Sequence, residues 1–202
     1  MDKNEVYITG VLVGAPRFVS DRYGERMYEL EMIATRNSGA EDAVLLHVGE
    51  YKLGNRVAGM VPGAVVRVLG EIRWYKEDET RNRLGVHVHD MSLENVELGN
   101  NLVRLTGALC KEPIFRWTPN GRAVCELMVK AVRKGGRYTK VPVIAWGECA
   151  KWAKDLERGQ RVELQGRMQS RDYDKEQEDG TVKVLRTTEV SAAWVREEMG
   201  EM

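Results

Sequence analysis

Basic and aromatic side chains concentrate in one stretch of this chain, residues 130–146. Its first part carries five cations and no acidic residue: Lys130, Arg133, Lys134, Arg137 and Lys140. Side chains two positions apart on a strand share a face, so Tyr138, Lys140 and Trp146 would project together, away from a row of small apolar residues. Cations of this kind meet phosphates, and flat rings stack on bases. The alternative is an ordinary solvated hairpin.

The next predicted strand repeats this arrangement. On one face of this strand the apolar side chains are Val162, Leu164 and Met168. The other face carries a polar row: Arg161, Glu163, Gln165, Arg167, Gln169, Arg171 and Tyr173. On its own the row would be a plain polar face, but two neighbouring strands with the same pattern favour a track for phosphates and bases.

Three further tryptophans have other predicted roles. Trp152 falls on the apolar stripe of a short helical segment and is predicted to be core, and Trp194 is predicted to be core or interface. Trp117 follows Arg116 in a turn and fits either role. Two of the three histidines, His87 and His89, share a strand face without a third ligand nearby in sequence, so we predict no metal site.

The sequence contains no nucleophile–base constellation and no phosphate-cradling loop, which argues against an enzyme. Its three cysteines lack C-x-x-C spacing, which predicts a reducing, cytoplasmic setting, either a bacterial nucleoid or a mobile element. No run approaches the roughly 18 apolar residues of a membrane span. We expect no cofactor and no membrane partner.

The chain contains an internal repeat of about 97 residues. Residues 4–36 laid on 101–133 give 12 identities in 33 positions, including Thr9/Thr106, Gly10/Gly107 and Pro16/Pro113. The halves differ in charge: residues 1–99 hold 12 basic and 16 acidic side chains, net −4, whereas 100–202 hold 19 and 15, net +4. The repeat predicts two closely packed domains, 1–98 and 101–198, with different tasks.

Each half alternates apolar and polar residues in five segments. In the second half these cover 103–109, 123–132, 139–146, 161–171 and 181–195. A helical pattern over 148–157 lies between the third and fourth segments, and Gly159 follows it. The first half has a weaker helix over 51–60. The order predicts an all-β chain of two tandem OB-fold β-barrels, each five-stranded with a short helix between strands three and four, and a sandwich is the alternative.

Residues 101–195 resemble the bacterial single-stranded-DNA-binding protein family. The matching pieces are NLVRLTGAL, PIFRWTPNGRAV, VPVIAWGECAKWAKDLERGQRVELQGRMQSRDY and RTTEVSA. The turn TPNG-x-AV and the run G-x-x-V-x-x-x-G-x-x-x-x-R-x-[WY] are specific in combination. The resemblance implies an OB barrel that wraps single-stranded DNA without a cofactor, and it assigns base stacking to Tyr138, Trp146 and Tyr173.

The chain departs from that family in three places. The segment VRKGGR lacks the aromatic that the family carries in the arm after strand two. The repeat alignment puts Val48, Glu71 and Tyr75 where the second half has Trp146, Arg167 and Arg171, so the first half is predicted to bind weakly or to serve dimerisation. The chain stops at VREEMGEM without the family's acidic Pro-Phe tail, which makes it similar to the tail-less primosomal replication protein B.

The sequence therefore predicts non-catalytic binding of single-stranded DNA in replication, recombination or repair. The predicted contacts are Arg116, Trp117, Arg133, Lys134, Arg137, Tyr138, Lys140, Trp146, Arg167, Arg171 and Tyr173, with Trp74 and Tyr75 in the first half. A replication-restart or mobile-element accessory protein that acts through replication or primosome proteins is the alternative, and RNA is an alternative polymer. We expect a homodimer with four OB folds.

Overall fold

The computed structural model describes residues 2–22, 24–53, 60–77, 81–96, 99–176 and 180–198. In the first half, the described strands are β1 (Asn4–Leu12), β2 (Arg17–Arg22), β3 (Glu25–Thr35), β4 (Glu41–Gly49), β5 (Val65–Lys76) and β6 (Asn82–Glu94), with α1 (Glu50–Leu53) between β4 and β5. The second half has β7 (Asn101–Leu109), β8 (Ile114–Trp117), β9 (Ala123–Val132), β10 (Tyr138–Trp146), β11 (Arg161–Glu176) and β12 (Val182–Glu197), with α2 (Glu148–Ala153) before β11. None of the helices in these ranges has the length and apolar character that crossing a membrane requires.

Each half closes into a five-stranded barrel. In the first, β1 pairs with both β3 and β5, and the parallel pairing of β4 with β6 completes the order β1-β3-β4-β6-β5. The second half repeats this order with β7, β9, β10, β12 and β11. Strand order and helix position confirm the predicted pair of OB barrels rather than a sandwich. The short strands β2 and β8, which pair antiparallel with β3 and β9 at the ends of the sheet, were not predicted.

The barrel interiors are filled by apolar side chains from every second position of the strands. Ile8, Met32 and Leu46 are fully buried in the first barrel, and Leu164 and Met168 are fully buried in the second. Alternation of interior and exterior residues is what a closed sheet requires. The predicted inward parity of the strand over 161–171 is therefore confirmed.

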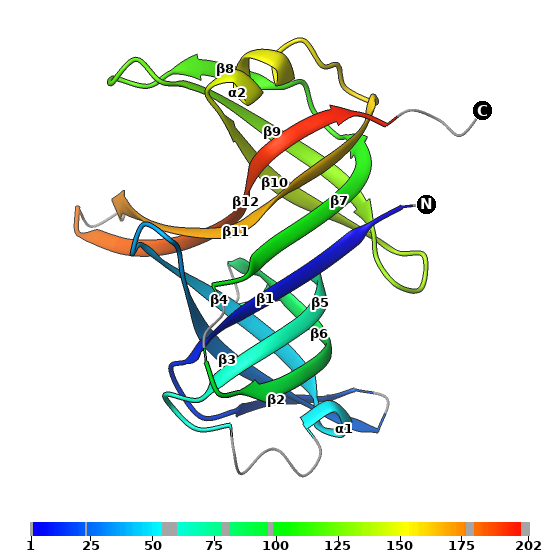
Figure 1. The fold of residues 1–202 in the computed structure, drawn as a ribbon, viewed down its shortest axis with the longest axis vertical. Helices are drawn as coiled ribbons and strands as arrows, with labels where there is room; N and C mark the ends of the chain where they lie inside the picture. The colour runs from blue at the N-terminus through cyan, green and yellow to red at the C-terminus, as the bar shows by residue number, and fades with distance from the viewer. Residues whose placement is uncertain are drawn as a thin grey trace.

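The two barrels join through one antiparallel strand pair, β1 with β7, at the centre of the molecule (Figure 1). Val6 lies opposite Val103, its own counterpart in the repeat, and Asn4–Leu105 mirrors Ile8–Asn101. The barrels are thus related by a pseudo-twofold axis near Val6. The predicted boundary lies between β6 and β7, and residues 97–98 of it are outside the described residues.

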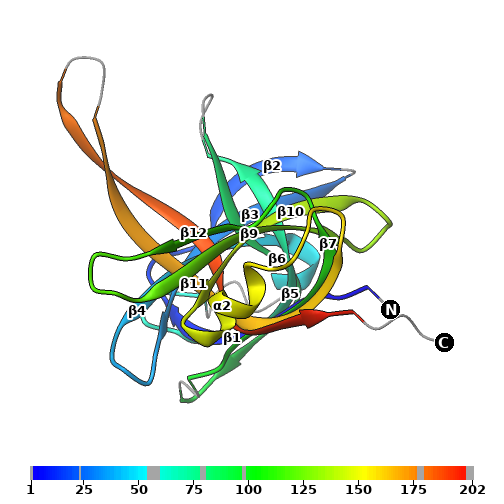
Figure 2. The ribbon, with the colours of Figure 1, turned by 90° about the horizontal axis from the view of Figure 1, so that it is seen from above.

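The fourth strand of each barrel, β5 in the first and β11 in the second, continues past the barrel as a hairpin with the strand that follows it, and this hairpin packs against the other barrel. Figure 2 shows the β11–β12 hairpin reaching far beyond the rest of the sheet. The Trp74 indole N–H of β5 donates to the Lys140 carbonyl of β10 at 2.6 Å. On the other side, the Ser170 N–H of β11 donates to Asp42 Oδ1, and the Ala43 N–H donates to Ser170 Oγ, both at 2.8 Å. These contacts fix one barrel against the other.

Both helices are shorter than predicted. In α2, Ala150 and Ala153 are buried, and Leu156 is buried in the turn that follows. Trp152 is 43% exposed, so the prediction that it belongs to the core is wrong. The buried face of the helix runs through Ala150 and Ala153 and continues to Leu156, and at about 100° per residue Trp152 lies to the side of that face. In the first half only Glu50–Leu53 is described as helix, and residues 54–59 of the predicted segment lie outside the described residues.

Candidate nucleic-acid interface

The outer face of β10 carries the predicted aromatics at its two ends. Tyr138 is 57% exposed, and the Lys130 ammonium of β9 lies 4.1 Å from its ring centroid. Trp146 is eight residues further on, about 27 Å away at the usual rise of a strand, and is partly buried. Between them Ile144 is buried although its parity is outward. The strand thus presents two separate aromatic positions rather than a continuous apolar strip.

Trp146 lies in a groove that both barrels build. We call it the arginine groove; its main residues are Arg36, Arg122, Trp146, Arg167, Gln169 and Ser191. The Arg122 guanidinium lies over the Trp146 ring, 4.8 Å from its centroid. Arg36 comes from the end of β3 in the first barrel and is held by the buried Asp42 through hydrogen bonds of 2.7 and 2.5 Å. The first barrel therefore supplies a cation to the aromatic site of the second.

Arg167 is the arginine of this group whose positive charge is least compensated by its surroundings. Burial lowers the pKa of Arg167 from its ordinary value, and the neighbouring charge of Arg36 lowers it further. Its Nη2 donates to Gln169 Oε1 at 3.0 Å, whereas its Nε has no hydrogen-bond partner among the described residues. A cation that is desolvated and under-paired is stabilised by an incoming anion. The groove is therefore suited to a phosphate beside a stacked ring.

Two other predicted arginines are already paired. The Arg171 Nε lies 3.4 Å from Glu189 Oε1, and burial raises the pKa of that carboxyl. Arg116 is bonded to Glu126. Each arginine must give up or share its carboxylate to meet a phosphate. Trp117, beside Arg116, is 58% exposed and free on the β8 edge except for an edge contact with Phe115, 5.7 Å between ring centroids.

The basic loop between β9 and β10 lies against the first barrel. The Lys134 N–H donates to Glu71 Oε2 at 2.7 Å, and the Arg133 N–H closes the loop onto the Arg137 carbonyl. Gly135 and Gly136 both adopt positive φ, which glycine tolerates and which turns the chain there. The loop is thus anchored across the domains. Arg133 and Lys134 therefore lie beside the first barrel and not beside Trp146.

Trp74 and Tyr173 line a common groove between the two hairpins, together with Arg83 and Arg186. We call it the hairpin groove. Tyr173 is 39% exposed and Trp74 is 40% exposed. Arg186 and Arg83 both lie near Glu31, at 3.5 and 3.1 Å. Two predicted aromatics from different domains are therefore brought together, which their separation in sequence did not reveal.

Tyr75 is committed to other contacts. Its ring stacks on His47 with centroids 3.4 Å apart, and its hydroxyl lies 3.2 Å from His87 Nδ1. One face of the ring is covered. Among the described residues no group of three or more His, Cys, Asp or Glu side chains is arranged to hold a metal ion.

The strand registers correct the sequence alignment of the two repeats at one position. Gly49 pairs with Met27 on β3, and Trp146 pairs with Val124, the repeat counterpart of Met27, on β9. Gly49, and not Val48, therefore occupies the place of Trp146. Val48 is fully buried in the first barrel. The bulges at Leu69/Gly70 and Gln165/Gly166 confirm that Glu71 matches Arg167.

Two of the three arginines of the groove were missing from the predicted contacts. Arg36 is an identity in the repeat, since Arg133 is its counterpart, but nothing local indicates that it contacts the other barrel. Arg122 lies in the TPNGRAV turn that carries the family resemblance. That turn was the available signal for Arg122.

Comparison with known proteins supports the resemblance. The model of the "Single-strand binding protein family" matches residues 100–196. A single-stranded DNA-binding protein of Thermus thermophilus is 27% identical over 197 residues, covering 82% of this chain and 74% of that protein. Single-stranded DNA-binding protein 2 of Streptomyces coelicolor is 32% identical over 107 residues, 47% of this chain and 54% of that protein.

A solved structure has the same tandem arrangement. The crystal structure of the wild-type single-stranded DNA binding protein from Thermus aquaticus matches with a TM-score of 0.76 at 21% identity, covering 100% of this chain and 95% of that one. At this identity the likeness establishes the fold. The predicted resemblance is thus confirmed for residues 100–196 by sequence and for both barrels by architecture.

Proposed function

We propose that this protein binds single-stranded DNA without catalysis, using the arginine groove of the second barrel as its principal contact. The observation that carries the proposal is the composition of that groove, which is lined by a tryptophan ring and three guanidinium groups. A base that stacks on Trp146 would bring its phosphates to Arg122 and Arg167. The family match over residues 100–196 supports the same polymer.

The remaining contacts follow from the surface around this groove. Tyr138, Lys130 and Lys140 form a second stacking position at the far end of β10. Trp117 and Arg116 extend the surface on the β8 side. The second barrel is accordingly the main binding domain, and the first contributes Arg36 and Trp74.

The proposal is tested by tryptophan fluorescence during titration with a thymidine oligomer of about 35 nucleotides, since an OB fold covers about 4–16 nucleotides. Quenching by the single strand and not by the matching duplex is expected. Affinity should fall with salt at a log–log slope of about −0.7 for each phosphate neutralised. Absence of binding at low salt would contradict the proposal, and equal affinity for a matched RNA would widen it to both polymers.

No catalytic step belongs to the proposal. Labelled single-stranded DNA incubated with the protein and Mg²⁺ should be recovered intact. Cleavage that a purified Trp146→Ala variant also shows would identify a second activity. The three free cysteines support a reducing, cytoplasmic setting.

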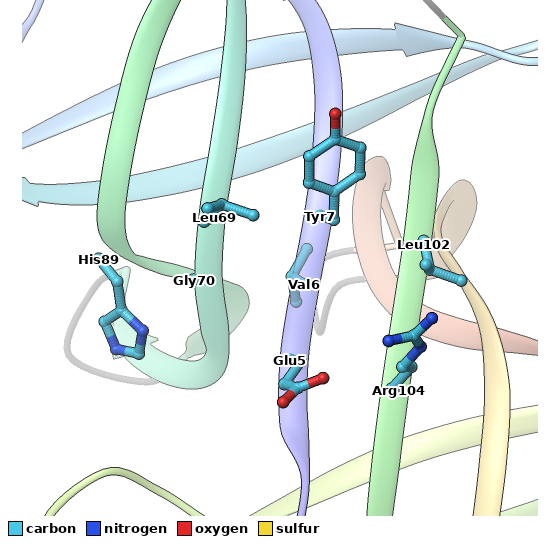
Figure 3. Close-up of a pocket in the computed structure, with 8 residues that line it drawn as sticks. All are labelled: Glu5, Val6, Tyr7, Leu69, Gly70, His89, Leu102 and Arg104. Atoms are coloured by element: carbon cyan, nitrogen blue, oxygen red, sulfur yellow. The ribbon is translucent and has the colours of Figure 1, made fainter.

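A second copy of the chain fits the outer face of the central sheet, shown in Figure 3. Leu69, Tyr7 and Leu102 form an apolar row across β5, β1 and β7, and Leu69 is 42% exposed. Glu5 and Arg104 lie opposite each other beside that row. A twofold axis through this face would set like apolar rows together and Glu5 against Arg104 of the other copy. The result is a homodimer with four barrels.

Light scattering tests the dimer. The protein should have twice the chain mass at micromolar concentration, and Leu69→Arg should give the chain mass with the barrels still folded. Val182→Arg, a comparably exposed apolar position on the β12 hairpin, is the matched control and should remain dimeric. A wild-type protein with the mass of one chain would rule the dimer out.

A further inference from the structure

The pseudo-twofold axis produces a second groove on the first barrel, which we call the histidine groove. Its main residues are Glu25, Gly49, Arg73, His87, His89 and Lys134. The repeat of about 97 residues matches Glu25 to Arg122, and the strand registers match Gly49 to Trp146 and His87 to Ser191. Each groove is also completed by the loop after the second strand of the other barrel, through Arg36 in one case and Lys134 in the other.

At two matched positions the histidine groove carries the opposite charge to the arginine groove, whereas at a third Arg73 replaces the neutral Gln169. Where the arginine groove places the guanidinium of Arg122 over an indole ring, the histidine groove has the carboxylate of Glu25 beside a glycine. That carboxylate fills the place a side chain would need, because a Cβ built on Gly49 would collide with Glu25 Oε1. The histidine groove therefore lacks both the stacking ring and the cation that the arginine groove has at the matching place.

The second reversal lies behind the groove wall, at a residue that contacts three of the lining residues. Arg167 corresponds to Glu71, which is 2% exposed. Glu71 Oε1 lies 2.5 Å from Arg73 Nη2, while its Oε2 accepts the Lys134 N–H at 2.7 Å and lies 3.8 Å from His89 Nε2. A buried carboxylate surrounded by a guanidinium, a backbone N–H and an imidazole occupies the kind of site that would otherwise receive a phosphate oxygen.

We propose that Glu71, assisted by Glu25, acts as an internal anion that closes the histidine groove to single-stranded DNA. The inference rests on the proposed function, because it assumes that the matching arginine groove takes the strand. The carboxylate of Glu71 satisfies Arg73 and the Lys134 N–H from within, and it repels a phosphate approaching the same cations. DNA affinity is thus confined to one of the two related grooves.

The test uses two neutral variants of the full chain. Glu71→Gln keeps the size of the side chain and an acceptor for the Lys134 N–H, but removes the charge. Glu25→Gln leaves the buried Glu71–Arg73 pair untouched and therefore gives a result even if Glu71→Gln folds poorly. Glu163→Gln is the matched control, since Glu163 is also ion-paired, to Lys3 and Arg196, on the outer sheet away from both grooves.

Two measurements separate the outcomes. Salt titration by anisotropy of labelled DNA should give slopes steeper by about 0.7 for each extra phosphate in Glu71→Gln or Glu25→Gln, and unchanged in Glu163→Gln. Lysine footprinting should leave Lys52, which lines the histidine groove, reactive in the wild-type complex and protected in the variant complexes. Protection of Lys52 in the wild type, or unchanged slope and reactivity in both variants, would overturn the inference.

Failure of the proposed function gives a different result. In that case the wild-type protein does not bind the oligomer at all, and Trp146→Ala changes nothing. An unfolding midpoint that shifts in Glu71→Gln without any change in slope or footprint would show that Glu71 serves only to join the domains, and would also overturn the inference.

Discussion

The side-chain amide of Asn101 binds the backbone of Met168 at both ends: its Nδ2 donates to the Met168 carbonyl, and its Oδ1 accepts the Met168 N–H, each at 2.9 Å. Asn4 makes the same two bonds to Ile72 at 3.1 and 2.9 Å. Both asparagines begin the first strand of a barrel and hold its fourth strand just past the bulge. The duplication has thus preserved a device that sets where the β5 and β11 hairpins leave the barrels.

The first prediction concerns stability. Asn101→Ala and Asn4→Ala each leave the backbone N–H and C=O of one protected residue without their side-chain partners, which should lower the free energy of unfolding by about 1–3 kcal/mol. Urea unfolding followed by circular dichroism measures this. Ser92→Ala, which removes an ordinary surface hydrogen bond to Glu94, is the control and should cost well under half as much. Equal losses in all three variants would show that the clamp has no special role.

The second prediction is that Arg167→Gln changes stability and DNA affinity in opposite directions. Because Arg167 is desolvated and repelled by Arg36, its removal should leave stability unchanged or raise it. The same change should weaken DNA binding and reduce the magnitude of the salt slope by about 0.7. Urea midpoints and salt titrations are compared with those of Arg161→Gln, whose arginine is paired to Asp2 and Glu198. Loss of stability with full affinity in Arg167→Gln would refute the role given to it.

The third prediction uses two tryptophans of the second barrel. Trp146→Ala should cost about 1–3 kcal/mol of DNA-binding free energy, the usual value of a stacked base. It should also remove most of the quenching seen on titration. Trp152→Ala removes an equally large ring that is 43% exposed on α2, outside the groove, and should bind as the wild type does. If both variants bind alike, stacking at Trp146 is not part of the interface.

The histidine groove gives a prediction for pH. Burial lowers the pKa of His87 from 6.5 to about 4, with Arg73, Arg133 and His89 repelling its cation and Glu71 partly opposing them. The unfolded chain takes up the proton near 6.5, so the stability from neutral His87 is complete above that pH and is lost as pH falls toward 4. His87→Gln should therefore lose less stability than the wild type between about pH 7.5 and pH 5 in urea titrations. Parallel losses would show that His87 does not titrate in this window.

Local pattern was sufficient to predict which strand residues face inward, because a closed barrel forces strict alternation, as at Val162, Leu164 and Met168. It was also sufficient to place Trp146 outward. It failed at Trp152, since the apolar spacing fitted two neighbouring faces of the short helix and packing buries the one with Ala150 and Ala153. It also missed β8, an edge strand of four residues.

The composition of the arginine groove was not predictable from local pattern. Arg36 enters the groove of Trp146 only because β1 pairs with β7 in one register, and that pairing is set by the association of two whole barrels. The same holds for the basic loop: its charges predicted a surface for phosphates or a solvated hairpin, whereas the Lys134 N–H is held by Glu71 of the other domain. Long-range register, not residue type, decides which cations meet the aromatic.

The last prediction concerns the hairpin groove, where Trp74 and Tyr173 face a common space. If the DNA runs from the second barrel to the first along this groove, it contacts these rings, so their contribution should depend on oligomer length. Tyr173→Ala should weaken binding of an oligomer of about 35 nucleotides more than that of one of about 10, which fits within a single barrel. Trp74→Phe keeps a ring but loses the indole bond to Lys140, and should be milder. Equal losses at both lengths would place Tyr173 within the first contact site, and no loss at either length would remove the hairpin groove from the DNA path.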